Sequence, residues 1–381
     1  MLLQGGRALI GGQFVAADIE IDEESGLIGT VGKDGSNGRS FDARGLYVLP
    51  GIVDIHADAF ERQFMPRPGV AFPIDVALLE SDRQAVSNGI TTMFHGVTWS
   101  WEPGLRGADN ARAILAAIEL LRPALCADTR CHLRYETFNL TAEMEVSGWL
   151  DERRIDLLGF NDHMPGAHAP PRTRKLAEMA ARAGLSNEDF LALVDRLRDH
   201  ADEVPESVAR LAARAHVNNV PTLSHDDLSP DQRRWFRERD CRLCEFPTTE
   251  ATAQEAIAAG DHVVLGAPNV VRGGSHIGWI GAAEMIARGC CTILASDYYY
   301  PAPLLAAFRL AADDILPLEQ AWAYVAERPA QAAGLHDRGT IETARRADLV
   351  VIAADDGHRP RAIATLCKGR FVHLATPDRL S

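Results

Sequence analysis

The chain has no excess of positive charge. Its 39 lysine and arginine residues are outnumbered by 53 aspartate and glutamate residues, and the formal net charge at pH 7 is −14. Nonspecific nucleic-acid binding needs a basic face that displaces phosphate counterions, so this composition argues against a nucleic-acid partner. The average sign does not decide the charge of a local site, because clustered arginines or a bound metal ion can still attract an anion.

Long hydrophobic runs are missing as well. No apolar run reaches transmembrane length, and the first residues lack a basic stretch followed by a long apolar segment. Seven cysteines, an odd number in a chain of 381 residues, favour reduced thiols over a disulfide framework. We therefore expect a cytoplasmic protein with no membrane partner, and the sequence leaves its oligomeric state open, a homo-oligomer included.

The two ends of the chain share one pattern. Residues 2–48 and 345–381 contain short apolar stretches broken by glycines and other turn formers, which is typical of brief antiparallel strands. We predict that residues 1–48 and 345–381 combine in one small β-sandwich domain, and that residues 49–344 form the main body. The length suffices for this plan, because a TIM-type barrel takes roughly 250 residues.

The central body alternates strand-like apolar runs with helical segments such as residues 111–120. This repetition implies a parallel sheet, and eight repeats favour an α/β fold of the (β/α)8 TIM-type barrel class, with a doubly wound open sheet as the alternative. After Phe160 one connection is exceptionally long and charged, and we predict a lid or insertion at about 164–216. The eight strand candidates are residues 47–55, 91–94, 131–135, 155–160, 221–224, 242–244, 262–265 and 291–295.

Polar side chains follow each of these apolar runs. The carboxyl ends of barrel strands converge on one face, so residues distant in the sequence become neighbours there. Imidazoles and carboxylates are donors for zinc, manganese or iron, and burying several carboxylates without a cation is unfavourable. We assign no site role to His95, whereas Glu245 is either a ligand or orients a neighbouring group. The strand-end residues are His56, Asp58, His95, Glu136, Asp162, His163, His225, Asp226, Asp227, Glu245, Asn269 and Asp297.

Several motifs along the chain occur together in one known family. Residues 50–56 after a β-rich amino terminus, with residues 337–341 and 347–350 before the last strands, resemble the frame of the amidohydrolase superfamily. Residues 56–58, 162–166, 224–227, 245–249, 266–276 and 296–299 are similar to a narrower subfamily that acts in phosphonate catabolism. Asp58 stands where most members of the superfamily carry a second histidine, as it does in this subfamily.

The resemblance implies two divalent metal ions, zinc first, with manganese or iron as alternatives. It places the metal ligands at His56, Asp58, Glu136, His225 and Asp297, with His163 as a further ligand. Glu136 would be the bridging carboxylate. Asp297 would also accept the proton of the attacking water, which makes it the predicted catalytic residue.

The resemblance also implies a reaction. The subfamily hydrolyses the 5-triphosphate of α-D-ribose 1-methylphosphonate to the 5-phosphate and diphosphate with metal-activated water. An anionic phosphorylated sugar needs guanidinium groups and backbone donors, and the glycine pair 273–274 after Arg272 has N–H groups that could cradle an anion. The predicted substrate-binding residues are Arg62, Arg67, Arg134, Asn269, Arg272, Gly273, Gly274, Ser275 and His276.

Two other functions fit the same scaffold. One is hydrolysis of an amide, as by a deacetylase or a cyclic amide hydrolase, which would use the same metal ions on a carbon centre. The other is a noncatalytic metal-binding homologue. The position of residues 272–276 distinguishes phosphate hydrolysis from amide hydrolysis. A position beside the metal ions favours a phosphate substrate, and a position in solvent favours an amide substrate.

Overall fold

The computed structural model describes residues 1–32, 38–67, 70–164, 173–274, 281–354 and 359–381 of the chain. Ser275 and His276 therefore lie outside the described residues, as does part of the predicted insertion. The chain divides into two compact units. Unit 1 consists of Met1–His95, Leu121–Arg130 and His262–Ser381, and unit 2 of Gly96–Leu120 and Cys131–Asp261.

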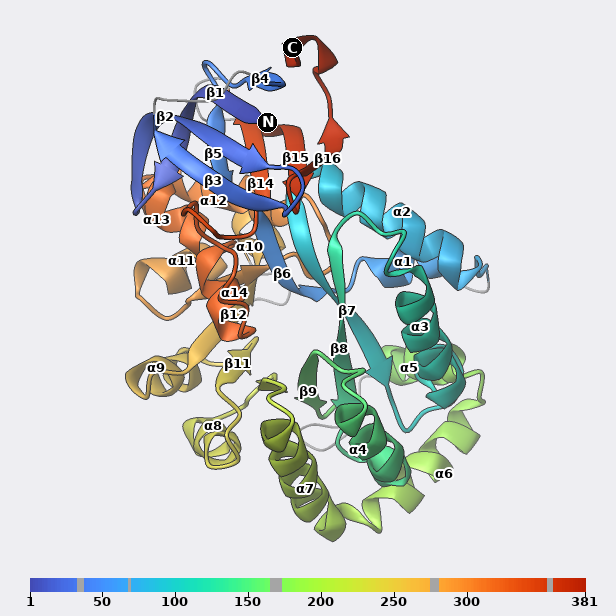
Figure 1. Ribbon diagram of the computed structural model, residues 1–381. Coiled ribbons are helices and arrows are strands. Elements are labelled where there is room, and N and C mark those ends of the chain that lie inside the picture. Colours follow the sequence, from blue (N-terminus) through green and yellow to red (C-terminus); the bar gives the residue numbers. More distant parts are fainter. Residues whose placement is uncertain (33–37, 68–69, 165–172, 275–280, 355–358) are drawn as a thin grey trace. The chain divides into compact units, whose positions relative to one another are not determined.

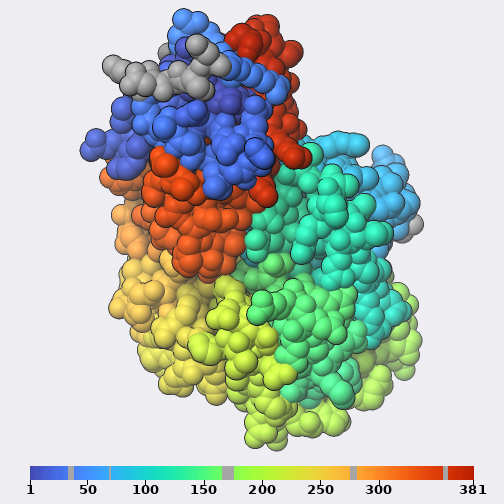
Figure 2. All heavy atoms as spheres, in the orientation of Figure 1, coloured from blue at the N-terminus to red at the C-terminus, as the bar shows by residue number. Residues whose placement is uncertain are grey.

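The two ends of the chain combine in one sheet within unit 1, as predicted (Figure 1). In the space-filling view, the blue N-terminal residues lie beside the red C-terminal residues (Figure 2). Its order is β16-β15-β14-β5-β1-β2-β3, and β4 pairs with β1. Antiparallel pairing of β14 with β5 joins segments from opposite ends of the sequence. The strands are β1 Leu2–Ile10, β2 Gln13–Asp22, β3 Leu27–Gly32, β4 Ser40–Asp42, β5 Tyr47–Pro50, β14 Leu349–Ala353, β15 Arg361–Cys367 and β16 Arg370–Leu374.

The eight predicted central strands are all present, and the fold is a (β/α)8 barrel with a small β domain. Their hydrogen-bonded order follows their order in the chain, and the pairs are parallel. A parallel bridge between Ala57 and Asp297 joins the ends of the first and last of them in unit 1. The strands are β6 Ile52–Ala57, β7 Ile90–Trp99, β8 Asp128–Glu136, β9 Leu157–Asn161, β10 Thr222–His225, β11 Leu243–Glu245, β12 His262–Gly266 and β13 Ile293–Ala295.

The first predicted strand, residues 47–55, is wrong as a single element. The chain leaves the small sheet after β5 and enters the barrel as β6, so that one apolar run serves two sheets. Gly51 separates the two strands, and a Cβ atom at this position would lie 2.2 Å from Oγ1 of Thr91. Only glycine lets the backbone pass so close to β7.

Helices follow or connect the strands, and three of them begin at residues whose hydroxyl oxygen accepts a backbone N–H: Ser186 (α6), Ser229 (α8) and Thr249 (α9). No described helix is long and apolar enough to cross a membrane. The helices are α1 Phe60–Phe64, α2 Ile74–Ser87, α3 Ala108–Leu121, α4 Glu143–Asp151, α5 Thr173–Ala183, α6 Asn187–Arg198, α7 Val204–Val217, α8 Pro230–Arg237, α9 Glu250–Ala258, α10 Ala267–Arg272, α11 Ala282–Ala287, α12 Ala302–Ala312, α13 Leu318–Ala323 and α14 Glu327–Ala332. Single turns of 3₁₀-helix are η1 Gly104–Arg106, η2 Leu140–Ala142, η3 Ala201–Glu203 and η4 Pro377–Arg379.

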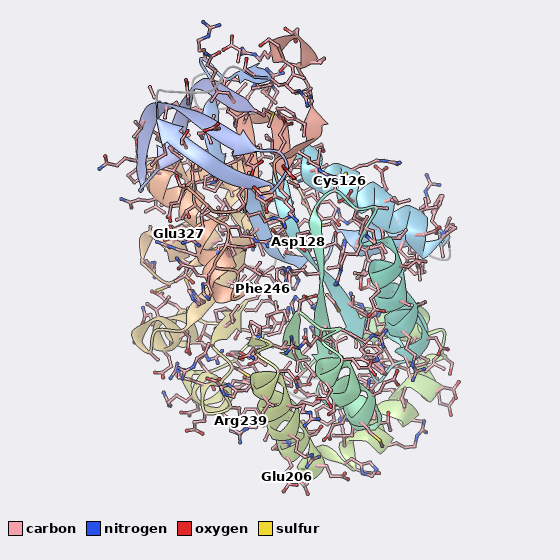
Figure 3. All side chains as sticks on the ribbon, in the orientation of Figure 1. Cys126, Asp128, Glu206, Arg239, Phe246 and Glu327 are labelled. Carbon is pink, nitrogen blue, oxygen red and sulfur yellow. The ribbon has the colours of Figure 1, made fainter. Side chains whose placement is uncertain are left out.

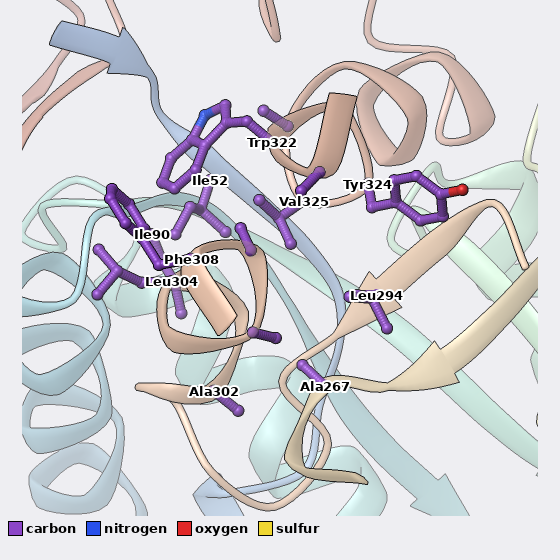
Figure 4. Close-up of a cluster of buried hydrophobic side chains, with 14 of the residues drawn as sticks. Ile52, Ile90, Ala267, Leu294, Ala302, Leu304, Phe308, Trp322, Tyr324 and Val325 are labelled. Carbon is purple, nitrogen blue, oxygen red and sulfur yellow. The ribbon is translucent and has the colours of Figure 1, made fainter. Parts of the chain in front are cut away.

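Unit 1 has a large apolar core, built from side chains of its strands and helices (Figure 4). Ile52 from β6 and Leu294 from β13 belong to it, together with Trp322 of α13, which is completely buried. The indole N–H of Trp322 donates to the carbonyl of Pro50, so the point where the chain enters the barrel is fixed from the core side.

The described part of the insertion predicted at about 164–216 is mostly helical and contains α5, α6 and α7. In unit 2, α5 and α6 enclose a small core of their own that includes Met179 and Phe190. Arg182 of α5 donates to the buried Glu102 at 2.7 Å, which ties this helix to the segment after β7.

Candidate metal centre

Unit 1 brings together three of the predicted ligands at the ends of β6 and β13. One donor atom each from His56, Asp58 and Asp297 lies within 4.8 Å of the other two, and His56 Nε2 is 3.2 Å from Asp58 Oδ2. Backbone hydrogen bonds fix this spacing, because Asp297 donates to the His56 carbonyl and Asp58 donates to the Asp297 carbonyl. The three side chains form group 1.

The buried carboxylate of Asp54 holds the backbone that carries group 1. Asp54 lies two residues before His56 on β6, has no exposed surface, and accepts the backbone N–H groups of His56 and Ser296 at 3.3 and 3.0 Å. Burial raises the pKa of Asp54. Asp54 was not among the predicted site residues, although alternation along β6 places it on the same face as His56.

Unit 2 brings together a second set of donors. One atom each from His163, His225 and Asp226 lies within 4.8 Å of the other two, and His225 Nδ1 is 3.1 Å from Asp226 Oδ2. These three side chains form group 2. Asp226 was among the strand-end residues but not among the predicted ligands.

Glu136, at the end of β8, lies against group 2. Its Oε1 is 2.5 Å from His163 Nδ1, and its other oxygen accepts the His163 backbone N–H at 3.0 Å. Burial acts to raise the pKa of Glu136, but the charge and hydrogen bonds of His163 outweigh it and hold that pKa at about 2. The charge of Glu136 raises the pKa of His163 in turn. In this arrangement the carboxylate orients the imidazole.

The strand ends around group 2 carry two further polar contacts. Arg134, two residues before Glu136 on the same face of β8, has Nη2 at 3.3 Å from His225 Nε2. The completely buried Glu245 has Oε2 at 3.9 Å from the same nitrogen. Phe246, which follows it and is labelled in Figure 3, packs its ring against the His225 ring with centroids 5.3 Å apart.

The motif at residues 224–227 divides between the site and a buried ion-pair network. His225 and Asp226 belong to group 2, whereas Asp227 accepts from the Ser224 hydroxyl at 2.7 Å and from Arg233 at 3.2 Å. Arg233 has no exposed surface and also donates to the Cys241 and Leu243 carbonyls. Arg233 was not among the predicted site residues, and its hydrogen bonds link Ser224 of β10 to Leu243 of β11.

Two predicted substrate-binding arginines meet next to group 1. Arg272, at the end of α10, donates to the Tyr298 hydroxyl at 3.2 Å, and the Arg62 guanidinium lies over the Tyr298 ring, 5.1 Å from its centroid. Asn269 lies beside group 1 as well. A Cβ atom added to Gly266 would be 3.7 Å from Asn269 Nδ2 and 3.2 Å from Asp297 Oδ2, so both side chains lie against the same glycine. Arg67 is exposed.

The expected role of the glycine pair needs correction. The N–H groups of Gly273 and Gly274 donate to the carbonyls of Val270 and Asn269 and end helix α10. Gly273 is left-handed, with φ 76°, as a helix C-cap requires. These two N–H groups therefore close a helix and are not open to an anion.

His95 lies outside both groups, as expected. It is buried on β7 with its ring against Phe60, centroids 5.4 Å apart, and burial lowers its pKa to about 4. We therefore interpret His95 as a neutral imidazole that packs in the core.

Comparison with known proteins places this geometry in a family. Residues 142–373 match the model of the amidohydrolase family. Over 373 residues the chain is 32% identical to the α-D-ribose 1-methylphosphonate 5-triphosphate diphosphatase of Escherichia coli K12, covering 94% of this chain and 96% of the relative. The chain belongs to the amidohydrolase family.

One further sequence match and one solved structure of the same fold extend the comparison of this amidohydrolase. A shorter match joins it to a dihydroorotase of Trichlorobacter lovleyi, 28% identical over 96 residues, which is 24% of this chain and 21% of the relative. The solved structure of atrazine chlorohydrolase from Arthrobacter aurescens TC1, complexed with zinc, shares the fold, with a TM-score of 0.65 and 16% identity over 98% of this chain and 95% of the other.

The donor sets of the amidohydrolase fit divalent metal ions. Group 1 offers one imidazole and two carboxylates, and group 2 offers two imidazoles and one carboxylate. Three mixed nitrogen and oxygen donors suit zinc and related transition metals better than calcium or magnesium, which prefer oxygen donors alone.

Proposed function

We propose that this amidohydrolase cleaves the 5-triphosphate of α-D-ribose 1-methylphosphonate to the 5-phosphate and diphosphate. The observation that carries the proposal is the pair Arg62 and Arg272, which meets at Tyr298 directly after the group 1 residue Asp297. Planar guanidinium groups match phosphoryl oxygens in shape and charge. The extended similarity to the E. coli diphosphatase supports the same chemistry.

We propose that each group holds one divalent cation, zinc first. Group 1 would use His56, Asp58 and Asp297, and group 2 would use His163 and His225 with Asp226, while Glu136 orients His163. Bound cations of this kind lower the pKa of water and neutralise charge that develops on phosphoryl oxygens.

The protein's own side chains would position the substrate and move the proton. Water breaks the anhydride bond between the first and second phosphoryl groups, and the Asp297 carboxylate accepts its proton. Arg62 and Arg272 hold the departing diphosphate, which carries away the electron pair of the broken bond. The buried Arg134 adds positive charge on the side of group 2.

The test follows the metal-loaded protein and its triphosphate substrate by phosphorus NMR. The expected result is growth of inorganic diphosphate and 5-phosphate signals, with a turnover rate about 10²- to 10⁴-fold lower in Asp297→Asn, the usual contribution of a positioned base. An unchanged spectrum of the triphosphate in the presence of protein with both cations bound would contradict the proposal.

A second candidate is hydrolysis of a cyclic amide such as dihydroorotate, which the shorter match to a dihydroorotase favours. The same protein sample distinguishes the two. Ring opening of dihydroorotate without diphosphate release supports the second candidate, and the reverse pattern supports the first.

A further inference from the structure

Tyr298 connects two cationic side chains in unit 1. It follows Asp297 directly after β13 and is partly buried. Its hydroxyl oxygen accepts a hydrogen bond from Arg272 Nη1 at 3.2 Å, and its ring face carries the Arg62 guanidinium at 5.1 Å from the centroid. One side chain thus contacts arginines that come from α1 and from the end of α10.

The charge of these arginines is not neutralised locally. Neither Arg62 nor Arg272 has a carboxylate partner among the described residues. Many other described arginines do have one, as in the exposed pairs Arg112–Glu145 and Arg210–Glu143. Two unpaired guanidinium groups on one aromatic ring form a cationic surface that suits a multivalent anion.

Tyrosine is well suited to hold such a pair. Its ring face attracts a cation through the aromatic quadrupole, while its hydroxyl accepts a hydrogen bond in the plane of the ring. A long arginine side chain loses much rotamer freedom when it binds a ligand, so fixing it beforehand improves affinity.

We propose that Tyr298 is a positioning residue that holds Arg62 and Arg272 as a clamp for the diphosphate portion of the substrate. This inference rests on the proposed function and deepens it. The clamp begins one residue after Asp297, so the leaving diphosphate is held beside the group that accepts the proton. It follows that the protein prefers substrates with at least two phosphoryl groups beyond the bond that breaks.

Three variants test the clamp in the metal-loaded protein. Tyr298→Phe removes the hydrogen bond and keeps the ring, and Tyr298→Leu removes both. Tyr299→Phe is the matched control, because Tyr299 is the next residue and its side chain is 45% exposed. The probe is inorganic diphosphate, measured by isothermal titration calorimetry, with metal content and melting temperature recorded for each variant.

The clamp predicts that Tyr298→Phe weakens diphosphate binding about tenfold, which corresponds to one lost hydrogen bond to a charged group. Tyr298→Leu weakens it about threefold further through loss of the ring. KM for the triphosphate substrate rises by similar factors while kcat changes less, and metal content, melting temperature and the Tyr299→Phe control stay at wild-type values.

Two results contradict the inference in different ways. Wild-type protein that binds and releases diphosphate, with both Tyr298 variants unaffected, overturns the clamp alone. Wild-type protein that neither binds nor releases diphosphate overturns the proposed function and the clamp with it.

Discussion

Strained residues mark the strand ends that carry the candidate ligands. Asp226 after β10, Phe246 after β11 and Asp297 after β13 all have φ between 52° and 58°. Left-handed backbone costs roughly 1–2 kcal/mol for an ordinary side chain, less for aspartate, whose short polar side chain finds local hydrogen bonds. Two of these three residues belong to groups 1 and 2, so at these two strand ends the left-handed backbone turns a candidate ligand out of the strand direction.

His95 predicts how stability depends on pH. Burial lowers its pKa from the ordinary 6.5 to about 4, so the folded state keeps this imidazole neutral where the unfolded chain protonates it. The stability that this provides is complete above pH 6.5 and is lost as pH falls toward 4. Replacing His95 with leucine removes the dependence. The free energy of unfolding of His95→Leu relative to wild type should therefore rise by about 2 to 3 kcal/mol between pH 7.5 and 4.5.

Urea denaturation at both pH values measures this difference. The exposed His336 gives the matched control, and His336→Leu should follow the wild type at both pH values. A His95→Leu variant that loses stability in parallel with the wild type down to pH 4.5 would show that this histidine is already protonated in the folded state.

At the scale of elements, buried ion pairs in the connection from β10 through α8 to β11 hold the turn that carries two residues of group 2. Arg233 pairs with Asp227 and Asp261 and caps two carbonyls, and all three side chains are almost fully buried. Buried charges of this kind add little net stability compared with apolar side chains, but they are costly to leave without a partner. Their value here is to fix the turn that carries His225 and Asp226.

Arg233→Met should therefore destabilise the protein strongly. It leaves the buried Asp227 without its arginine partner, which typically costs about 3–5 kcal/mol, whereas Asp261 keeps its ion pair with Arg237. Arg234→Met is the control, because Arg234 is the next residue of α8, is 48% exposed and pairs with Asp231 and Glu255 at the surface. Its expected effect is within about 1 kcal/mol. Differential scanning calorimetry compares the two variants, and equal losses of melting temperature would contradict the structural role assigned to Arg233.

How well the sequence predicts each element depends on where its partners lie. Buried parallel strands are continuous apolar runs, and this made all eight barrel strands visible. The division at Gly51 was not visible, because it depends on the close approach of Thr91. The prediction that Gly273 and Gly274 bind an anion was wrong because the sequence of residues 267–272 did not indicate the short helix α10, which Gly273 ends. Arg233 was missed because its charged neighbours on α8 resemble a solvated helix face, and its burial depends on the distant Asp261.

At the scale of the whole molecule, the chain collects its candidate ligands from many separate strand ends. Position after an apolar run was a sufficient signal for every residue of both groups, since the barrel architecture converts chain order into proximity. The supporting residue Asp54 gave no such signal, because it lies inside a buried strand. Glu136 gave the same signal as the residues of both groups, and only the structure shows its contact with His163.

The assignment of one cation to each group predicts the metal content of the whole protein. Wild-type protein dialysed against zinc should hold about two equivalents by plasma mass spectrometry, and His56→Ala and His225→Ala should each lose about one, because each removes an imidazole from a different group. His216→Ala is the control, since His216 is exposed and pairs only with Asp240 among the described residues. Cations that bind only the folded state at about 1,000 times their Kd add about 4 kcal/mol per site, so chelation should also lower the melting temperature by several degrees. Two equivalents retained in either ligand variant would contradict the assignment for that group.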